Sequence, residues 1–162
     1  MSDINPHSTA RVAGHPLHPM IIPFPIAFLV TAFVTDLVFL NTGSPGWATG
    51  SIWLLGAGVA MALVAAVFGF TDFFGDRQIR ALRTAWWHMG GNLLAVAIAA
   101  VNWWLRFSGG AQDAVAGTGV ILSGLVVALL LFNGWMGWEL VYRHHVGIVD
   151  EAEPAGRLEP RA

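Results

Sequence analysis

The stretch GHPLHPMIIPFPIAF, residues 14–28, places two histidines and four prolines directly before a long apolar run. A residue that precedes proline is disfavoured in the α region, so His15 and His18 are biased toward extended backbone. In a polyproline-like segment the period is three residues, and in a first helical turn the i and i+3 positions also share a face. Either backbone predicts that His15 and His18 lie together where the apolar run begins.

The composition is that of a membrane protein. Hydrophobic residues make up 56% of the 162 residues and charged residues 11%, whereas about a quarter of the residues of a soluble domain are charged. The chain has no cysteine, which excludes disulfides, cysteine-held zinc or iron–sulfur clusters and cysteine nucleophiles. A net charge of −2 without a basic run predicts no nucleic-acid partner. The first apolar run is too long for a cleavable signal peptide, so we expect the N-terminus to be retained.

Four apolar segments have the roughly 20 residues that a helix needs to cross a bilayer. We therefore predict an all-α fold, an integral membrane four-helix transmembrane bundle formed by one domain, residues 14–147. Residues 1–13 should form a flexible N-terminal segment, and residues 148–162 a solvated C-terminal tail. The spans are expected at about residues 20–40, 47–70, 84–107 and 115–142.

The arginines predict the orientation. Lys and Arg near the ends of spans favour the cytoplasmic side. With four spans, only Arg106 falls on one side, so that side should be external and both termini cytoplasmic. The arginines on the opposite side are Arg11, Arg77, Arg80, Arg83 and Arg143.

The third span carries a polar stripe. Its members follow alternating steps of four and three residues, which is one face of a helix, and they are His88, Asn92, Ala95, Ala99, Asn102 and Arg106. Polar groups are costly in hydrocarbon, so this face should point into the bundle. Asp36 lies near the outer end of the first span, at the level of Arg106. We predict that Asp36 and Arg106 form a structural polar pair, as an ion pair or through Asn102. The alternative is that Arg106 extends by itself to the lipid headgroups.

Five of the six histidines fall at span ends on the predicted cytoplasmic side, and two interpretations of them stay open; they are His15, His18, His88, His144 and His145. In the first, the imidazoles face solvent or bond to backbone carbonyls and serve structure alone. In the second, they bind a cofactor, because neutral imidazole is a common metal and haem ligand. The metal ligands would be His15, His18 and His88, with Asp72 or Asp76 as a further candidate.

A haem would draw on a wider set of residues. Arg83 and its neighbours would face the propionates, and glycines near His88 and on the fourth span would make room for a planar group. Asp72, Glu139 or Asn92 would accept the second ring N–H of a ligating histidine. The candidate cofactor-binding residues are His15, His18, His88, His144, Arg83 and Asn92.

Several motifs together resemble the bacterial membrane-protein family called domain of unknown function 2231. They are the GHPLHPMIIPFPIAF string, Asp36 ending the first span, Gly69-x-x-Asp72, and Trp87-His88-x-x-x-Asn92. The resemblance runs from about His15 to Gly147. It implies a four-span protein of the bacterial cytoplasmic membrane with no settled biochemical activity. Some relatives carry a further histidine where this chain has Pro23.

Two hypotheses for the function follow. The first is an electron-transfer subunit with a histidine-ligated b-type haem or transition metal at the cytoplasmic side, working with a redox partner protein and not a complete enzyme by itself. The second is a non-redox structural or partner-binding membrane protein without a cofactor, as a single chain or a homo-oligomer. No nucleophile–base pair is identifiable, so we predict no catalytic residue.

Overall fold

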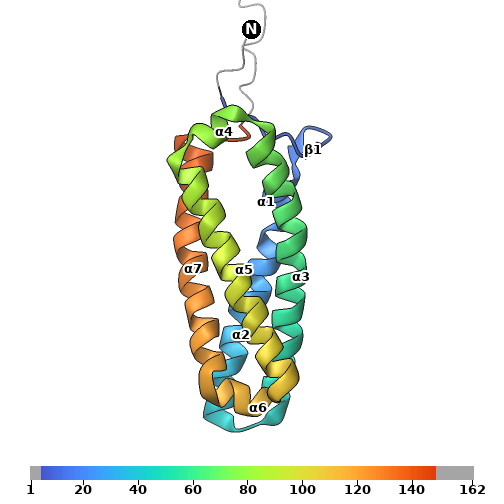
Figure 1. The fold of residues 1–162 in the computed structure, drawn as a ribbon. Coiled ribbons are helices and arrows are strands. Elements are labelled where there is room, and N and C mark those ends of the chain that lie inside the picture. The colour runs from blue at the N-terminus through green and yellow to red at the C-terminus, as the bar shows by residue number, and fades with distance from the viewer. Residues whose placement is uncertain (1–4, 149–162) are drawn as a thin grey trace, which may run out of the picture.

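The computed structural model describes residues 5–148, which are almost entirely helical (Figure 1). The four long helices are α2 Pro23–Thr42, α3 Pro45–Gly75, α5 Arg83–Gly109 and α7 Val120–Trp138. Shorter helical segments connect or extend them: α1 Leu17–Ile21, α4 Arg77–Ala81, α6 Ala111–Ala114, and the π-helical η1 Val115–Gly119 and η2 Glu139–Arg143. Two short antiparallel strands, β1 Arg11–Val12 and β2 His15–Pro16, form a small hairpin.

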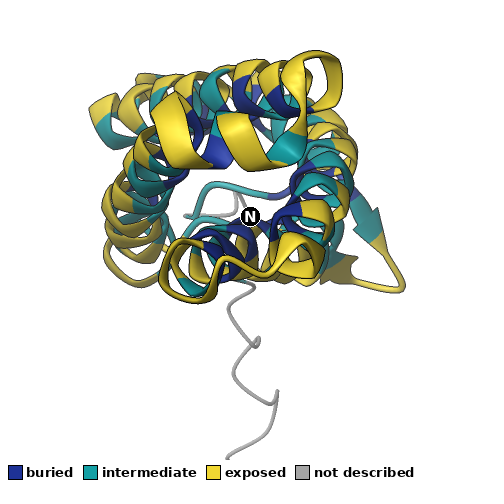
Figure 2. Cartoon of the chain, turned by 90° about the horizontal axis from the view of Figure 1, so that it is seen from below, coloured by how far each residue is buried: buried dark blue, intermediate teal, exposed yellow. Residues whose placement is uncertain are grey.

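The four long helices lie side by side and enclose one interior. Helix α2 packs against α3 and α7, and α5 packs against the same two helices. Seen along the bundle, exposed residues face outward and buried residues face the interior (Figure 2). The central core is formed by Leu29, Ala32, Leu55, Ala99 and Val126, contributed by all four helices. Small side chains at Ala32 and Ala99 allow the helices to approach closely, as is typical of membrane helices.

Within residues 5–148, three segments are long and apolar enough to cross a membrane: Leu17–Thr42, Pro45–Gly75 and Ala111–Arg143, with mean hydropathies of 2.1, 2.2 and 2.4. Their outer surfaces carry large apolar side chains, such as Trp53 at 76% and Leu131 at 73% exposure. Such extensive apolar surface is unfavourable in water and favourable in lipid. The prediction of an all-α membrane protein is therefore confirmed.

Helix α5 is less apolar than these three segments because its tryptophans, His88 and two asparagines lower its hydropathy. The polar face of α5 points inward, since Asn102 and Arg106 are buried. Its apolar face points outward, where Leu94 and Val101 are 52% and 55% exposed. This division matches the amphipathic pattern of the sequence.

Helices α3 and α5 are longer than the predicted spans, whereas α7 is shorter because η1 and η2 continue it at its two ends. Glycine and proline mark the turn between α2 and α3. Gly43, with φ of 66°, ends α2 in the left-handed conformation, and Pro45 begins α3 in its first turn. The first predicted span is divided at Ile22 into α1 and α2. Proline at position 23 has no N–H to continue the ladder of α1, which accounts for the break.

The N-terminal segment is attached to the end of α3. The Oδ1 atom of Asp72 accepts bonds from the Ser8 hydroxyl at 2.9 Å and the Ala10 N–H at 2.7 Å. Asp76 accepts the N–H of His7 at 2.7 Å. The sequence predicts a flexible segment over residues 1–13, whereas residues 7–10 are held by these carboxylates. Of the predicted tail, residues 149–162 lie outside the described residues.

Candidate functional site

Two of the predicted histidines face each other inside the bundle. His18 belongs to α1, and His88 lies in the second turn of α5. Their ring centroids are 6.4 Å apart and their planes are nearly perpendicular, at 85°. Helix α1 therefore places His18 beside His88, at the start of the polar stripe on α5.

Each of the two rings is fixed by a backbone carbonyl of a neighbouring helix. Nδ1 of His18 lies 2.9 Å from the carbonyl oxygen of Ala65 on α3, and Nδ1 of His88 lies 3.1 Å from that of Asn133 on α7. A carbonyl can only accept, so Nδ1 carries the proton in both rings and Nε2 of the neutral ring keeps its lone pair. Neither Nε2 makes a hydrogen bond within residues 5–148.

Glycines on the facing helices make room for the two rings. A Cβ at Gly69 would lie 3.1 Å from Cε1 and Nδ1 of His18, and one at Gly137 would lie 3.2 Å from Cε1 of His88. These distances are tighter than ordinary van der Waals contact. Two other glycines that the sequence offers as space for a planar group, Gly90 and Gly134, are exposed instead.

Asn133 adds an unusual polar group beside this pair. Asn133 is 2% exposed, and within residues 5–148 neither its Oδ1 nor its Nδ2 has a hydrogen-bond partner. The amide packs against α5 at Gly91, where a Cβ would collide with it. Leaving a buried polar group unpaired costs about 1–3 kcal/mol. Asn133 belongs to a weak polar pattern on the fourth span, but spacing alone could not show that its carbonyl and amide reach α5.

The other predicted site residues are not all brought to the pair. Nδ2 of Asn92 donates to the carbonyl of His88 at 2.9 Å, so Asn92 lies at the site and supports the turn that carries His88. His15 is exposed in β2, and Arg83 is exposed at the first position of α5. His144 follows η2 at the end of the last helical segment.

The predicted metal set of His15, His18 and His88 is not assembled. Among the described residues, no group of three or more His, Asp or Glu side chains could hold a metal ion. The hairpin is the reason, because β1 and β2 project from the side of the bundle, whereas α1, which carries His18, packs against α3 (Figure 1). The pair therefore offers two imidazoles.

The predicted acidic partners of the histidines are engaged elsewhere. Asp72 and Asp76 hold the N-terminal segment, and Oε1 of Glu139 lies 3.2 Å from Nη1 of Arg143. Backbone carbonyls take the role that the sequence assigns to these side chains. Sequence patterns of polar residues cannot reveal such a partner, because every residue carries a carbonyl.

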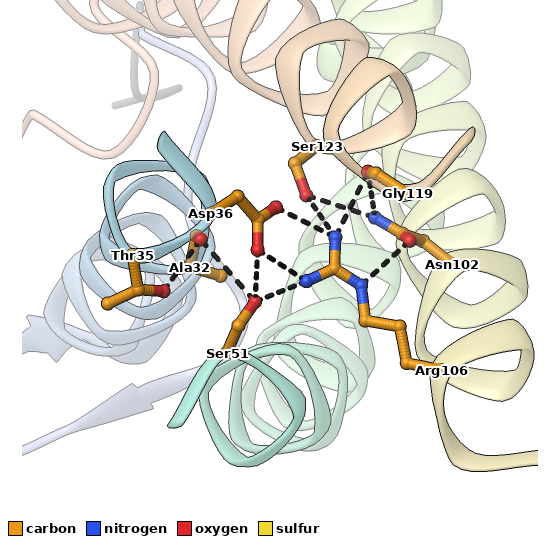
Figure 3. A network of polar contacts seen from close by, with 8 residues as sticks. All are labelled: Ala32, Thr35, Asp36, Ser51, Asn102, Arg106, Gly119 and Ser123. Atoms are coloured by element: carbon orange, nitrogen blue, oxygen red, sulfur yellow. Dashed lines mark hydrogen bonds and ion pairs between the residues drawn. The ribbon is translucent and has the colours of Figure 1, made fainter. Parts of the chain in front are cut away.

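A second polar cluster lies toward the α6 end of the bundle, where Asp36 of α2 meets Arg106 of α5 (Figure 3). Nη1 lies 2.5 Å from Oδ1 and Nη2 lies 2.7 Å from Oδ2, so the pair is bidentate. Both side chains are completely buried. Leaving either charge alone at this place would be strongly unfavourable.

The rest of the guanidinium is also fully bonded. Nε donates to Oδ1 of Asn102 at 3.0 Å, Nη1 bonds to the Ser51 hydroxyl, and Nη2 reaches the hydroxyl of Ser123 at 2.9 Å. The carbonyl of Gly119 accepts from both Nη2 and the Asn102 amide, each at 3.0 Å. Gly119 ends the π-helical segment η1, and such a widened turn frees carbonyls for side-chain donors. We interpret this saturated cluster as structural.

An open apolar groove of about 560 Å³ lies between α3 and α5 and contains neither histidine. Its lining includes the small residues Gly56, Ala57 and Ala60 and the aromatic rings of Trp53, Trp103 and Phe107. Small residues of this kind are typical of surfaces where membrane helices approach each other closely.

A family model described as "Predicted membrane protein (DUF2231)" matches residues 14–150. The chain belongs to this family. The matched DUF2231 region contains both the His18–His88 pair and the Asp36–Arg106 cluster, whereas the N-terminal residues that bond to Asp72 precede it. Searches among curated proteins and among solved structures gave no match.

Proposed function

We propose that this DUF2231 protein is an electron-transfer subunit whose His18 and His88 bind a b-type haem or a transition-metal ion, and that it is not a complete enzyme by itself. A bound haem or redox metal would supply one-electron chemistry. The protein would supply the two ligands, their orientation and an apolar surrounding. Its electron donor or acceptor would be a separate redox protein.

The hydrogen bonding of the two rings carries this proposal. A ligating histidine almost always donates its second ring N–H to a carboxylate, carbonyl or water, which fixes the ring and its tautomer. The carbonyls of Ala65 and Asn133 do this for His18 and His88, at 2.9 and 3.1 Å. Both Nε2 atoms are thereby left as lone-pair donors inside an apolar bundle.

The separation of the rings is compatible with both Nε2 atoms binding the same metal ion. Nitrogen–metal distances are about 2.0–2.1 Å, and adding the distance from each nitrogen to its ring centre gives centroids about 6 Å apart for an opposed pair. The observed 6.4 Å is close to this value.

The proposal includes a four-span topology with α5 as the third span and with both termini in the cytoplasm. Trp86-Trp87 and Trp103-Trp104 lie about 27 Å apart along α5, at the spacing of two aromatic belts. Trp86 and Trp104 are 50% and 60% exposed, as belt residues should be. Gly147 donates to the carbonyl of Pro6, so the two ends of the described chain meet at the α4 end.

The test is a visible absorption spectrum and a metal analysis of the purified protein from cofactor-replete cells. The wild-type chain should carry a Soret band or a stoichiometric metal. His18→Ala and His88→Ala should each remove it, while His15→Ala, a matched control from the same motif, should keep it because His15 is exposed. A wild-type protein without haem or metal would overturn the proposal.

The second candidate function is a non-redox structural or partner-binding membrane protein. Its supporting observation is that the same two bonds join α1 to α3 and α5 to α7. In that case His18→Ala and His88→Ala would lower the melting temperature without changing any spectrum. The two candidates therefore differ in what the purified wild-type protein contains.

A further inference from the structure

We propose that the α4 end of the bundle binds the phosphate groups of anionic phospholipids through Arg77 and Arg83. These residues lie at the start of α4 and just after it, in the connection between α3 and α5. The proposal needs only that the chain is a membrane protein and is independent of any ligand of the histidines.

The connection is held in place, so its arginines are presented on a fixed support. Oδ1 of Asp76 caps α4 by accepting the N–H of Gln78 at 2.7 Å. Ile79 is 5% exposed and packs in a cluster with Phe73 and Ala85. The indole N–H of Trp86 donates to the carbonyl of Arg80 at 2.9 Å. Little conformational entropy remains to be lost in this backbone when a ligand binds.

Among the residues that the structure describes, the side chains of two of the three arginines here have no partner. Arg80 donates to the carbonyl of Phe74. Arg77 and Arg83 are exposed, and their side chains make no hydrogen bond or ion pair within residues 5–148. Each guanidinium therefore presents its planar fork of donors to the surroundings.

The nearby carboxylates of Asp72 and Asp76 do not pair with Arg77 or Arg83, although they are close to them in sequence. Asp72 is bonded to Ser8 and Ala10, and Asp76 to the N–H groups of His7 and Gln78. A phosphate diester has two oxygens that match the guanidinium fork in a bidentate manner. The N-terminal segment thus occupies the acidic groups and leaves Arg77 and Arg83 for an external anion.

The surrounding aromatic side chains identify the anion as a lipid headgroup. Phe74, Trp86 and Trp87 beside the arginines are 61%, 50% and 57% exposed. Exposed tryptophans of membrane helices sit at the level of the headgroups. The guanidinium groups then lie at the depth of the phosphates, and attraction of basic residues to anionic lipids is expected there. A soluble anion would gain nothing from the exposed aromatic rings of Phe74, Trp86 and Trp87.

Native mass spectrometry of the full chain in detergent tests this proposal. The wild-type protein should retain phosphatidylglycerol in preference to phosphatidylcholine. Arg77→Gln and Arg83→Gln should each lower this preference about five-fold and the double variant about twenty-five-fold, since each basic residue contributes about 1 kcal/mol. Higher ionic strength should weaken the preference in the wild type and have little effect in the double variant.

Arg143→Gln is the matched control, because Arg143 lies at the same end but is paired with Glu139. It should change the preference much less. The proposal is wrong if the wild type shows no preference, or if Arg143→Gln has as large an effect as Arg83→Gln, which would indicate diffuse attraction. Displacement of the lipid by an equal concentration of inorganic phosphate would also overturn it and indicate a soluble anion.

Discussion

At the scale of single residues, the paired charges of Asp36 and Arg106 set the energetics of the α6 end. Both side chains are inaccessible, and every guanidinium nitrogen bonds to an acceptor (Figure 3). A buried pair adds little net stability relative to apolar residues, but removal of one partner leaves a charge unpaired. Because that unpaired charge is costly, the effect of removing one partner on the free energy of unfolding can be measured.

We expect Asp36→Ala and Arg106→Ala each to destabilise the protein by about 3–5 kcal/mol. The double variant should be destabilised by much less than the sum, because neither charge then remains alone. Thermal unfolding in detergent measures all three, with Asp113→Ala as an exposed acidic control near the same end. Strict additivity of the two effects would contradict the direct pairing.

For Asn133, whose buried amide is unpaired, we expect the opposite effect: its replacement should raise the stability of the protein. Asn133→Leu keeps a similar shape and removes both unsatisfied groups, so the cofactor-free protein should be stabilised by about 1–3 kcal/mol. The melting temperature is the measurement. Asn92→Leu is the matched control and should not stabilise, because the Asn92 amide is bonded to the carbonyl of His88. A clear loss of stability in Asn133→Leu would mean that the amide has a partner, such as a buried water.

At the scale of elements, carboxylates at the end of α3 position the segment that leads into α1. The bonds from Asp72 to Ser8 and Ala10 fix the chain shortly before the hairpin, and Leu17 N donates to the carbonyl of Ala10 at 2.9 Å. These contacts fix the start of α1 and therefore the place of His18. The prolines restrict the backbone of the segment that leads into α1 but do not by themselves determine its direction.

Asp72→Ala should release this segment. The N–H of Ala10 would lose its acceptor, and trypsin should cut after Arg11 several-fold faster than in the wild-type protein. Thr71→Ala is a suitable control, because the backbone carbonyl of residue 71 still accepts from the Thr9 hydroxyl. Equal cleavage rates in wild type and Asp72→Ala would show that other contacts hold the segment.

At the scale of the whole molecule, the arginines are distributed unequally between the two ends of the bundle. Arg77, Arg80 and Arg83 lie in or beside α4, at the end where both ends of the described chain also lie (Figure 1). Arg106, toward the other end, is neutralised by Asp36. Lys and Arg near the ends of spans set the orientation of membrane proteins.

We therefore expect reporter fusions at residue 78 and after residue 150 to report a cytoplasmic location. A fusion near Gly110, in the turn between α5 and α6, should report an external one. The residue 78 fusion is an internal control, because the α3–α5 turn and the C-terminus should agree. A cytoplasmic result at Gly110 would contradict four spans.

The sequence by itself determined the all-α membrane class, the family and the inward face of α5. Hydropathy and residue spacing along one helix are local properties, so they show which side chains share a face, as with His88 and Arg106. They also name Asp36 as a candidate partner for Arg106, because a buried arginine in lipid requires one.

Only the tertiary structure decided which residues meet across helices. The sequence allowed His15 and His18 on one face, but the hairpin leaves His15 exposed and α1 turns His18 toward His88. The carbonyls of Ala65 and Asn133 became ring partners through helix packing, which no side-chain pattern records. The physical reason is that contacts between helices depend on crossing angle and rotation, and small residues such as Gly69 and Gly137 permit many arrangements until the whole bundle is packed.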